Sequence, residues 1–129
     1  MTLPEKIFAL RRLSVLAGLS DPELAVLAEA ARERRYAPGA VVCARGRLPA
    51  RLVFVCTGAV TDTTGRDQGA VPGAAALLFD RPDDLGLVAA GGGAVCLQVA
   101  RSHLFTLVRQ CPAFVVTLLA EAPAAASPP

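Results

Sequence analysis

Residues 71–82 read Val71-Pro72-Gly73-Ala74-Ala75-Ala76-Leu77-Leu78-Phe79-Asp80-Arg81-Pro82, and this stretch decides the fold. Pro72 fixes one backbone φ angle and Gly73 frees the next, while three alanines leave almost no side chain beside the turn. The pattern predicts a tight turn that leads into one short buried helix. Because the first N–H groups of a helix point outward and favour an anion, the turn is also a candidate phosphate seat.

The composition indicates one apolar domain. The chain has 129 residues, of which 53% are hydrophobic and 19% charged, yet no run reaches the length of about 20 apolar residues that a membrane span needs. Glu5, Lys6, Arg11 and Arg12 interrupt the only N-terminal stretch that could serve as a signal peptide. We therefore expect a cytoplasmic domain without a membrane span.

The basic residues are scattered, with one local cluster. Thirteen basic residues against eleven acidic ones give a net charge of +2, which lacks the basic density of a dedicated nucleic-acid binder. Arg32, Arg34 and Arg35 stand together where a helix is expected to end. We interpret them as cations that complement the helix dipole, with a partner-binding patch as the alternative.

The cysteines and the one histidine indicate no metal or redox site. Cys-x-x-Cys spacing is absent, and a single histidine, His103, excludes multi-histidine metal sites. The cysteines stand mostly among apolar residues, where a free thiol behaves as a small hydrophobe. We expect them to be core residues, and His103 to be a surface residue in the first turn of a helix. The four cysteines are Cys43, Cys56, Cys96 and Cys111.

Helical periodicity dominates the first part of the chain. Apolar residues at helical spacing over residues 5–17 predict a short amphipathic helix or helical turns. Ser20 and Glu23 have the spacing of a capping box, and Pro22 suits the first helical turn, so a second helix should begin there. We expect the helical part to cover residues 5–34.

Strand-like periodicity follows from Pro38-Gly39 onward and predicts an antiparallel series over residues 38–100. A polar hairpin tip is expected at residues 65–69. Gly91-Gly92-Gly93 is interpreted as a hairpin turn rather than a phosphate loop, because hairpins need the positive φ that glycine supplies. The expected strands cover residues 41–44, 52–56, 59–61, 85–90 and 94–99.

The C-terminal part returns to helical spacing. Ser102 is a candidate cap for a helix through Val108, and Pro112 precedes a second helical run, so helices are expected over 102–120. Residues 122–129 contain only Ala, Pro and Ser and predict a disordered tail. Residues 1–121 are therefore expected to form the single domain.

Several motifs, in this order, resemble the cyclic nucleotide-binding domain of the catabolite activator protein and protein kinase A regulatory subunit superfamily. They are the opening from Phe8 to Leu24, Tyr36-Ala37-Pro38-Gly39, Gly46 followed by Leu52 to Gly58, and Gly73 to Leu78. The resemblance covers about Ile7 to Ala120. It implies a mainly β fold with flanking α-helices, a jelly-roll-like antiparallel β-barrel of eight strands, also called a double-stranded β-helix.

The ligand cassette departs from the family pattern. The family has a Glu that holds the ribose hydroxyl, where this chain has Ala74, and an Arg that pairs with the cyclic phosphate, where it has Asp83. A carboxylate in place of that Arg repels the phosphate, so micromolar binding should fall by about two decades or more. The resemblance places the degenerate ligand pocket at Gly73, Ala74, Ala75, Ala76, Leu77, Arg81, Pro82 and Asp83.

We expect a non-catalytic regulatory or interaction module that does not bind cAMP or cGMP in the usual mode. The alternative is a functional sensor in which Arg81 and the backbone amides of Ala74 to Ala76 hold the nucleotide; a surface pair of Arg81 with Asp83 or Asp84 is the competing role for that arginine. No catalytic set can be assembled from one histidine and scattered acids.

The expected partner is another protein or a second copy of the chain. The high apolar content favours self-association as an oligomer. No helix-turn-helix follows the barrel motifs, so direct DNA binding is not expected. No metal and no cofactor are expected, and a cyclic nucleotide is the one candidate ligand that the resemblance raises.

Overall fold

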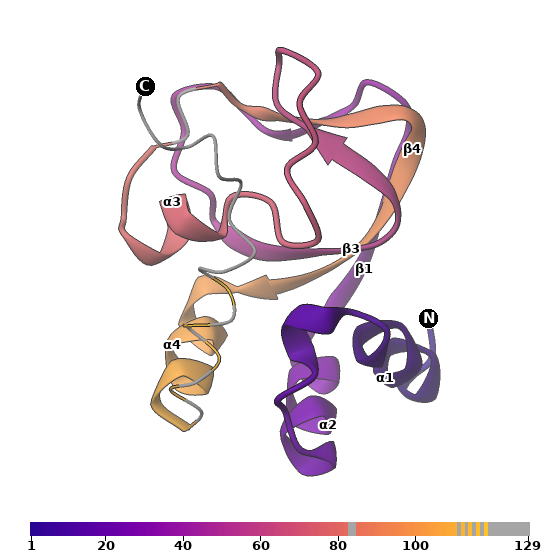
Figure 1. Cartoon of the computed structure of the whole chain (residues 1–129), viewed down its shortest axis with the longest axis vertical. Coiled ribbons are helices and arrows are strands. Elements are labelled where there is room, and N and C mark those ends of the chain that lie inside the picture. Colours follow the sequence, from indigo (N-terminus) through magenta and orange to yellow (C-terminus); the bar gives the residue numbers. More distant parts are fainter. Residues whose placement is uncertain (83–84, 111, 113, 115, 117, 119–129) are drawn as a thin grey trace.

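The structure, a computed structural model, describes residues 1–82, 85–110, 112, 114, 116 and 118. A helical N-terminal part precedes an antiparallel sheet, and a further helix follows the sheet (Figure 1). The predicted tail at 122–129, Cys111 and most of the second C-terminal helical run lie outside the described residues. No helix among the residues described is long and apolar enough to cross a membrane.

Two capped helices open the chain. Helix α1 (Leu3–Arg11) begins at a capping box formed by Thr2 and Glu5, and the short 3-10 helix η1 (Ser14–Leu16) follows. Helix α2 (Asp21–Ala30) begins at the predicted capping box, in which the Ser20 hydroxyl accepts from the Glu23 N–H and the Glu23 carboxylate accepts from the Ser20 N–H. The expected start of α2 is confirmed, and the helix or helical turns expected over 5–17 are present as α1 and η1.

The extent of the helical part was predicted wrongly at its C-terminal end. Helix α2 ends at Ala30, and strand β1 (Arg32–Tyr36) follows directly. The arginines of β1 therefore do not complement the end of a helix. Instead, Arg35 pairs with Glu33 at 2.9 Å, while Arg34 lies over the ring of Tyr36. Pairing with a strand some 60 positions away overrides the local helical pattern.

The described strands form one antiparallel sheet. Strand β4 (Leu87–Ala100) pairs with β1, with β2 (Val41–Cys43) and with β3 (Arg51–Thr61), so it is the central strand. The predicted class, mainly β with flanking helices, is confirmed. The described residues form four strands, whereas the resemblance implied eight. Strands β3 and β4 each run unbroken through a position where the sequence indicated a break, which accounts for part of the difference.

The glycines at 91–93 lie inside β4 and form no hairpin turn, contrary to the prediction. The register between β3 and β4 shifts here, since Gly58 pairs with Ala94 while Val60 pairs with Ala89. The extra residues of β4 form a bulge, and Gly93 has a φ of 78°. A Cβ atom at Gly93 would lie 2.6 Å from the carbonyl oxygen of Tyr36. Close approach of two strands, rather than a chain reversal, explains the glycine.

Ser102 also has a different place from the one predicted. Helix α4 (Arg101–Gln110) begins one residue earlier, so Ser102 lies within its first turn and does not cap it. His103 is exposed in that first turn, as expected.

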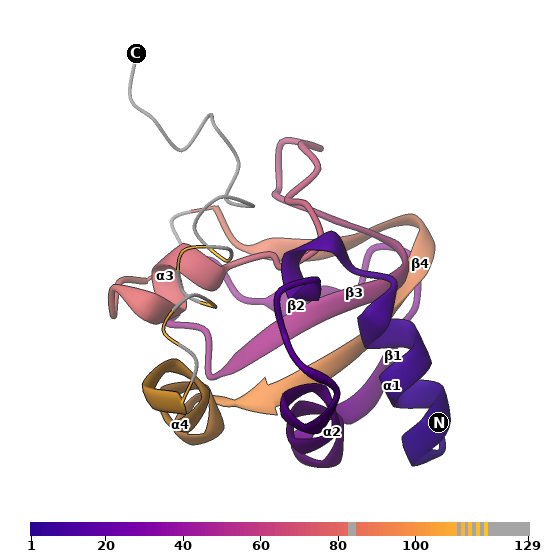
Figure 2. The same ribbon diagram turned by 60° about the horizontal axis from the view of Figure 1, so that its bottom comes forward.

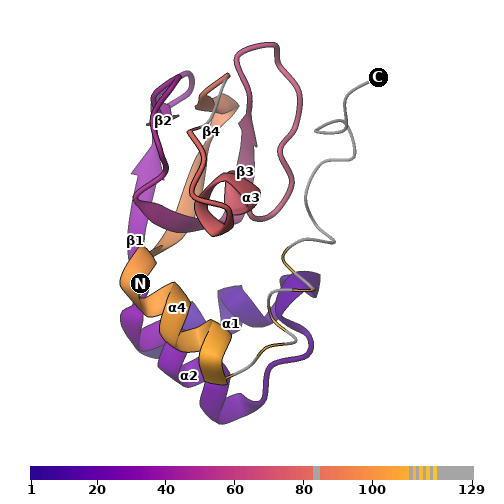
Figure 3. The ribbon, with the colours of Figure 1, turned by 90° about the vertical axis from the view of Figure 1, so that its left-hand side faces the viewer.

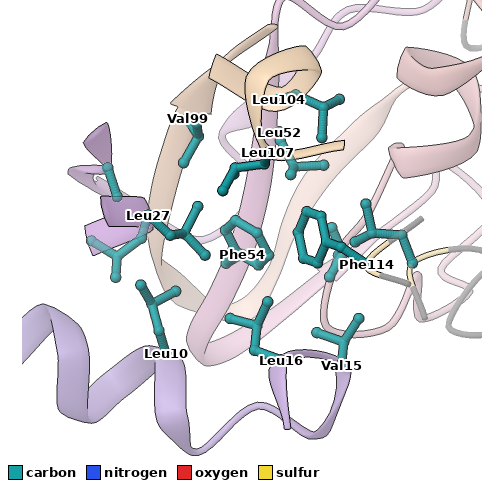
Figure 4. Packing of buried hydrophobic residues seen from close by; sticks show 14 of the residues in the cluster. Leu10, Val15, Leu16, Leu27, Leu52, Phe54, Val99, Leu104, Leu107 and Phe114 are labelled. Carbon is teal, nitrogen blue, oxygen red and sulfur yellow. The ribbon is translucent and has the colours of Figure 1, made fainter. Parts of the chain in front are cut away.

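Apolar residues pack on both faces of the sheet. Helices α1, α2 and α4 gather on one side of the strands (Figures 1 and 3), and their apolar residues meet the outward face of β3 and β4. Phe54 is fully buried at the centre of this cluster, between Leu10 and Leu16 on one side and Leu104 and Leu107 on the other (Figure 4). The opposite face carries a smaller cluster, made of Tyr36, Val53, Val55, Val60, Leu87, Ala89, Ala94 and Cys96.

The hairpin tip lies at residues 62–66, a few positions before the predicted 65–69, and it is organised by one carboxylate. Asp62 is 6% exposed, and its Oδ1 accepts from the Thr64 N–H at 2.8 Å, the Thr64 hydroxyl at 2.6 Å and the Arg66 N–H at 3.1 Å. These bonds, led by the one from the Thr64 hydroxyl, hold the pKa of Asp62 below its ordinary value. The carboxylate thus serves as the acceptor for two backbone N–H groups and one hydroxyl of the turn.

We expect Asp62→Ala to lower the free energy of unfolding at neutral pH, with a smaller loss in strong acid. The folded-state pKa is depressed, so this stabilisation is present above the unfolded-state pKa and is lost as the pH falls through the folded value. Urea unfolding at a series of pH values measures it. Thr63→Ala, at an exposed position in the same turn, is the matched control, and equal losses for both variants at neutral pH would contradict the role of Asp62.

Candidate functional site

The stretch from Val71 to Pro82 forms the predicted turn and short helix. Gly73 adopts a φ of 75°, in the left-handed region that favours glycine, and helix α3 (Ala74–Leu78) follows it. Ala74 and Leu77 are buried and join the larger apolar cluster. Helix α3 lies beside the strands, on the side of the molecule away from the N-terminus (Figure 2).

The backbone of the turn is closely covered by apolar side chains. A Cβ atom at Gly73 would lie 3.2 Å from Leu87 Cδ1 and 3.6 Å from Pro49 Cγ. The N–H of Ala74 donates to the carbonyl oxygen of Val71 at 3.4 Å. Of the three backbone amides predicted to hold a phosphate, those of Ala74 to Ala76, the first therefore already donates to a carbonyl oxygen of the protein.

Ala74 stands where the family pattern has its glutamate, and it is only 3% exposed. Its methyl group packs inward against the larger cluster. A side chain at this position is therefore part of the core, and no carboxylate is available here to hold a ribose hydroxyl.

Arg81 is exposed and is engaged with a neighbouring ring. Its guanidinium carbon lies 5.7 Å from the centroid of the Phe79 ring. The backbone N–H of Arg81 donates to the carbonyl oxygen of Ala76 at 2.9 Å. Pro82 beside it is exposed, while Asp83 and Asp84 lie outside the described residues, so the predicted surface pair is not tested. The structure thus brings Gly73 to Leu77 together, with Arg81 at the far end of the helix.

Asp80 links this segment to α4. It has a φ of 55°, and its carboxylate lies 2.8 Å from Arg101 Nη2. The Arg101 guanidinium also lies 5.4 Å from the centroid of Phe105, while its Nε is buried and has no hydrogen-bond partner among the described residues. An ion pair with side chains 66% and 31% exposed is worth at most about 1 kcal/mol, so it orients the two helices more than it stabilises the fold.

A cavity of about 270 Å³ adjoins the turn before α3, since Pro72 lines it, and opens on the face of the sheet that carries Gln98. Arginines from β1, β3 and the loop before β3 line it, together with apolar residues that include Val53, Pro72 and Leu87. Gln98 is 7% exposed and donates from its Nε2 to the hydroxyl of Tyr36. The arginines are Arg34, Arg47 and Arg51.

An open groove adjoins this cavity and shares Arg51 and Gln98 with it. Its volume is about 620 Å³, and Arg32 and His103 also line it. The sequence did not predict that these arginines gather around Gln98. The available signal was the alternation Arg32, Arg34, Tyr36, which has the period of a strand face and was interpreted as the end of a helix.

The described cysteines are free thiols without a metal-binding arrangement. Cys96 is fully buried, as expected of a core residue, whereas Cys43 and Cys56 are half-buried. Burial raises the pKa of Cys96 to about 11 and also raises that of Cys56, so both are protonated at neutral pH. No group of three potential metal ligands occurs in the part of the chain that is described.

Solved structures with a similar fold identify the architecture of this chain. The sequence matches no family model and no curated protein. Solved structures do match. A triple mutant of the regulatory subunit of a cAMP-independent protein kinase A from Trypanosoma brucei, bound to cAMP in its A site, is 22% identical, with a TM-score of 0.70 over 91% of this chain and 45% of that one.

Two further structures have the same fold. The cAMP-bound regulatory domain of Toxoplasma gondii protein kinase A is 20% identical, with a TM-score of 0.73 over 92% of this chain and 48% of that one. A protein from Geobacter metallireducens GS-15, provisionally identified as a cyclic nucleotide-binding protein, is 18% identical, with a TM-score of 0.71 over 94% of this chain and 92% of that one. The chain spans about half the length of both kinase structures, and its architecture is that of a cyclic nucleotide-binding domain.

Proposed function

We propose that this chain is a non-catalytic regulatory or interaction module that uses the cyclic nucleotide-binding fold without binding cAMP or cGMP in the usual mode. The observation that carries the proposal is the state of the cassette. Ala74 is buried where an acidic side chain would face the ligand, and Arg81, the arginine of the 71–82 stretch, lies against Phe79 at the surface.

The loss of charged hydrogen-bond partners lowers the affinity for a cyclic nucleotide. One hydrogen bond to a charged group contributes about 1.5 to 3 kcal/mol, which corresponds to about 10- to 150-fold in affinity. The cassette has lost such partners for both the ribose and the phosphate. The backbone turn is retained for a different reason, because Gly73 packs against Leu87 and Pro49 and α3 covers the sheet.

One of the similar structures supports the idea that the fold can serve regulation without the usual ligand. It is described as the regulatory subunit of a cAMP-independent kinase, and cAMP is bound to its triple mutant, in which one of the changes introduces an arginine. By the same reasoning, a chain whose cassette lacks the arginine retains the fold and acts through protein contacts.

The second candidate function is a cyclic nucleotide sensor built on Arg81 and the amides of Ala74 to Ala76. Arg81 is exposed, and its contact with the Phe79 ring is weak enough to be exchanged for a phosphate. The Ala74 amide, however, already donates to Val71.

Titration calorimetry with cAMP and cGMP is expected to show no binding at micromolar concentrations, for the wild type and for Arg81→Ala alike. The reason is that, among the described residues of the cassette, the Ala74 side chain carries no polar group and Arg81 lies against Phe79. A dissociation constant of a few micromolar that is lost in Arg81→Ala and retained in Arg12→Ala, an exposed arginine outside the cassette, would establish the sensor instead.

The partner in this proposal is another protein or a second copy of the chain. Large apolar side chains such as Phe8, Val41 and Phe79 are more than half exposed. Light scattering over a concentration series distinguishes self-association from binding to a separate protein.

A further inference from the structure

The register of the sheet gathers arginines around one buried polar residue. Gln98 of β4 pairs directly with Arg32 of β1, and Arg34 and Arg51 each pair with a residue two positions from Gln98. Opposite and diagonal neighbours on antiparallel strands emerge on the same face of the sheet and lie within reach of long side chains. Three guanidinium groups from two strands therefore surround Gln98.

These arginines form no ion pair within the described part of the chain. No described carboxylate lies within 4.0 Å of Arg32, Arg34 or Arg51, nor of Arg47 in the loop before β3. Glu29 is the one carboxylate that lines the adjoining groove. Like charges gathered at the mouth of a cavity raise the local positive potential and attract an anion.

The polar floor of the cavity is preorganised. The Arg34 guanidinium is held 5.2 Å from the centroid of the Tyr36 ring, and the hydroxyl of that ring accepts from the Gln98 amide. Val53, Leu87 and Pro72 form an apolar wall beside these groups. A ligand that fits both parts has an anionic group and a compact apolar body.

We propose that this cavity binds a small phosphorylated molecule, with its phosphate held by Arg34, Arg47 and Arg51. The planar guanidinium fork matches the oxygens of a phosphate in bidentate fashion, which a lysine cannot reproduce. The volume of about 270 Å³ is close to the lower end of ligand pockets, and the adjoining groove provides room for a larger ester.

This site deepens the proposed function, on which it rests, by naming a ligand class for a module whose cassette is lost. The residues that line the cavity include neither Arg81 nor any residue from Gly73 to Leu77. The phosphate would thus be held from β1 and β3, and not from the N-terminus of α3.

The test is a titration of the whole chain with inorganic phosphate and with AMP as a phosphate ester, at fixed ionic strength, followed by amide chemical shifts. We expect saturable binding, with shifts at β1, β3 and Gln98 and tighter binding of AMP than of phosphate. Arg51→Ala should weaken binding by about tenfold or more, because Arg51 lines both the cavity and the groove. Arg51→Lys, which keeps the charge but loses the fork, should also weaken it.

Arg12→Ala is the matched control, since it removes the same charge at an exposed position outside the cavity. Unfolding midpoints of the free variants establish that they are folded. Absence of saturation up to about 10 mM in the wild type, or equal weakening by Arg12→Ala and Arg51→Ala, would overturn the site. A cyclic nucleotide whose binding requires Arg81 but not Arg51 would overturn the proposed function instead.

Discussion

Phe54→Ala is expected to lower the free energy of unfolding by about 3 to 5 kcal/mol, through lost burial and the cavity left behind. The Phe54 ring is fully buried and lies where β3, the N-terminal helices and α4 meet (Figure 4). No neighbouring segment can close the gap without moving a helix, so little of the cost is recovered. Urea unfolding measures the change as a lower midpoint at nearly constant slope.

Phe8→Ala is the matched control for this substitution. Phe8 lies on α1 and is 66% exposed, so its removal should cost less than about 1 kcal/mol. Similar losses for the two variants would show that the centre of the core has been placed wrongly. A large loss for Phe54→Ala alone would show that one cluster joins the helices to the sheet.

Gly58→Ala is expected to destabilise the fold by about 2 to 5 kcal/mol. Gly58 has a φ of 79°, which costs an L-residue about 1 to 2 kcal/mol. The added Cβ would also lie 2.1 Å from the carbonyl oxygen of Gly93 and 2.9 Å from the Cα of Ala94, so the strands β3 and β4 must move apart. Overpacking of this kind adds about 1 to 3 kcal/mol.

Gly65→Ala separates these two contributions. Gly65 lies in the Asp62 hairpin with a φ of 87°, and a Cβ there would meet no atom within 4 Å. Only the backbone cost of about 1 to 2 kcal/mol should remain. If Gly58→Ala were no more destabilising than Gly65→Ala in the same denaturant series, the close approach of β3 and β4 would be refuted.

Local sequence preferences predicted the backbone of the cassette, residues 71–82. Pro72, Gly73 and the alanines predicted a turn and a short buried helix, and both are present, because the backbone preferences involved are local. The loss of a ligand-binding carboxylate at Ala74 is equally visible in the sequence. Whether Arg81 replaces the missing arginine remains a prediction, since its present contact with Phe79 depends on the tertiary arrangement.

The arginine site shows the opposite case. Arg34 and Arg51 are far apart in the sequence, and only their pairing with the two sides of β4 brings them together around Gln98. The bond between Gln98 and Tyr36 joins residues 62 positions apart. A single sequence carries no signal for such a pair. The alternation of Arg32, Arg34 and Tyr36 did indicate a strand, but the helical pattern that precedes it led to their interpretation as the end of a helix.

By itself, the sequence determined the start of α2, the cassette turn with its short helix, and the presence of a polar hairpin. Each of these depends on contacts within about four residues, such as the capping box of Ser20 and Glu23 or the carboxylate of Asp62. Only the tertiary structure decided that α2 ends at Ala30, that the glycines of β4 form a bulge, and that the arginines share one face. These features depend on strand pairing between distant segments, whose free energy exceeds the local preferences that the sequence displays.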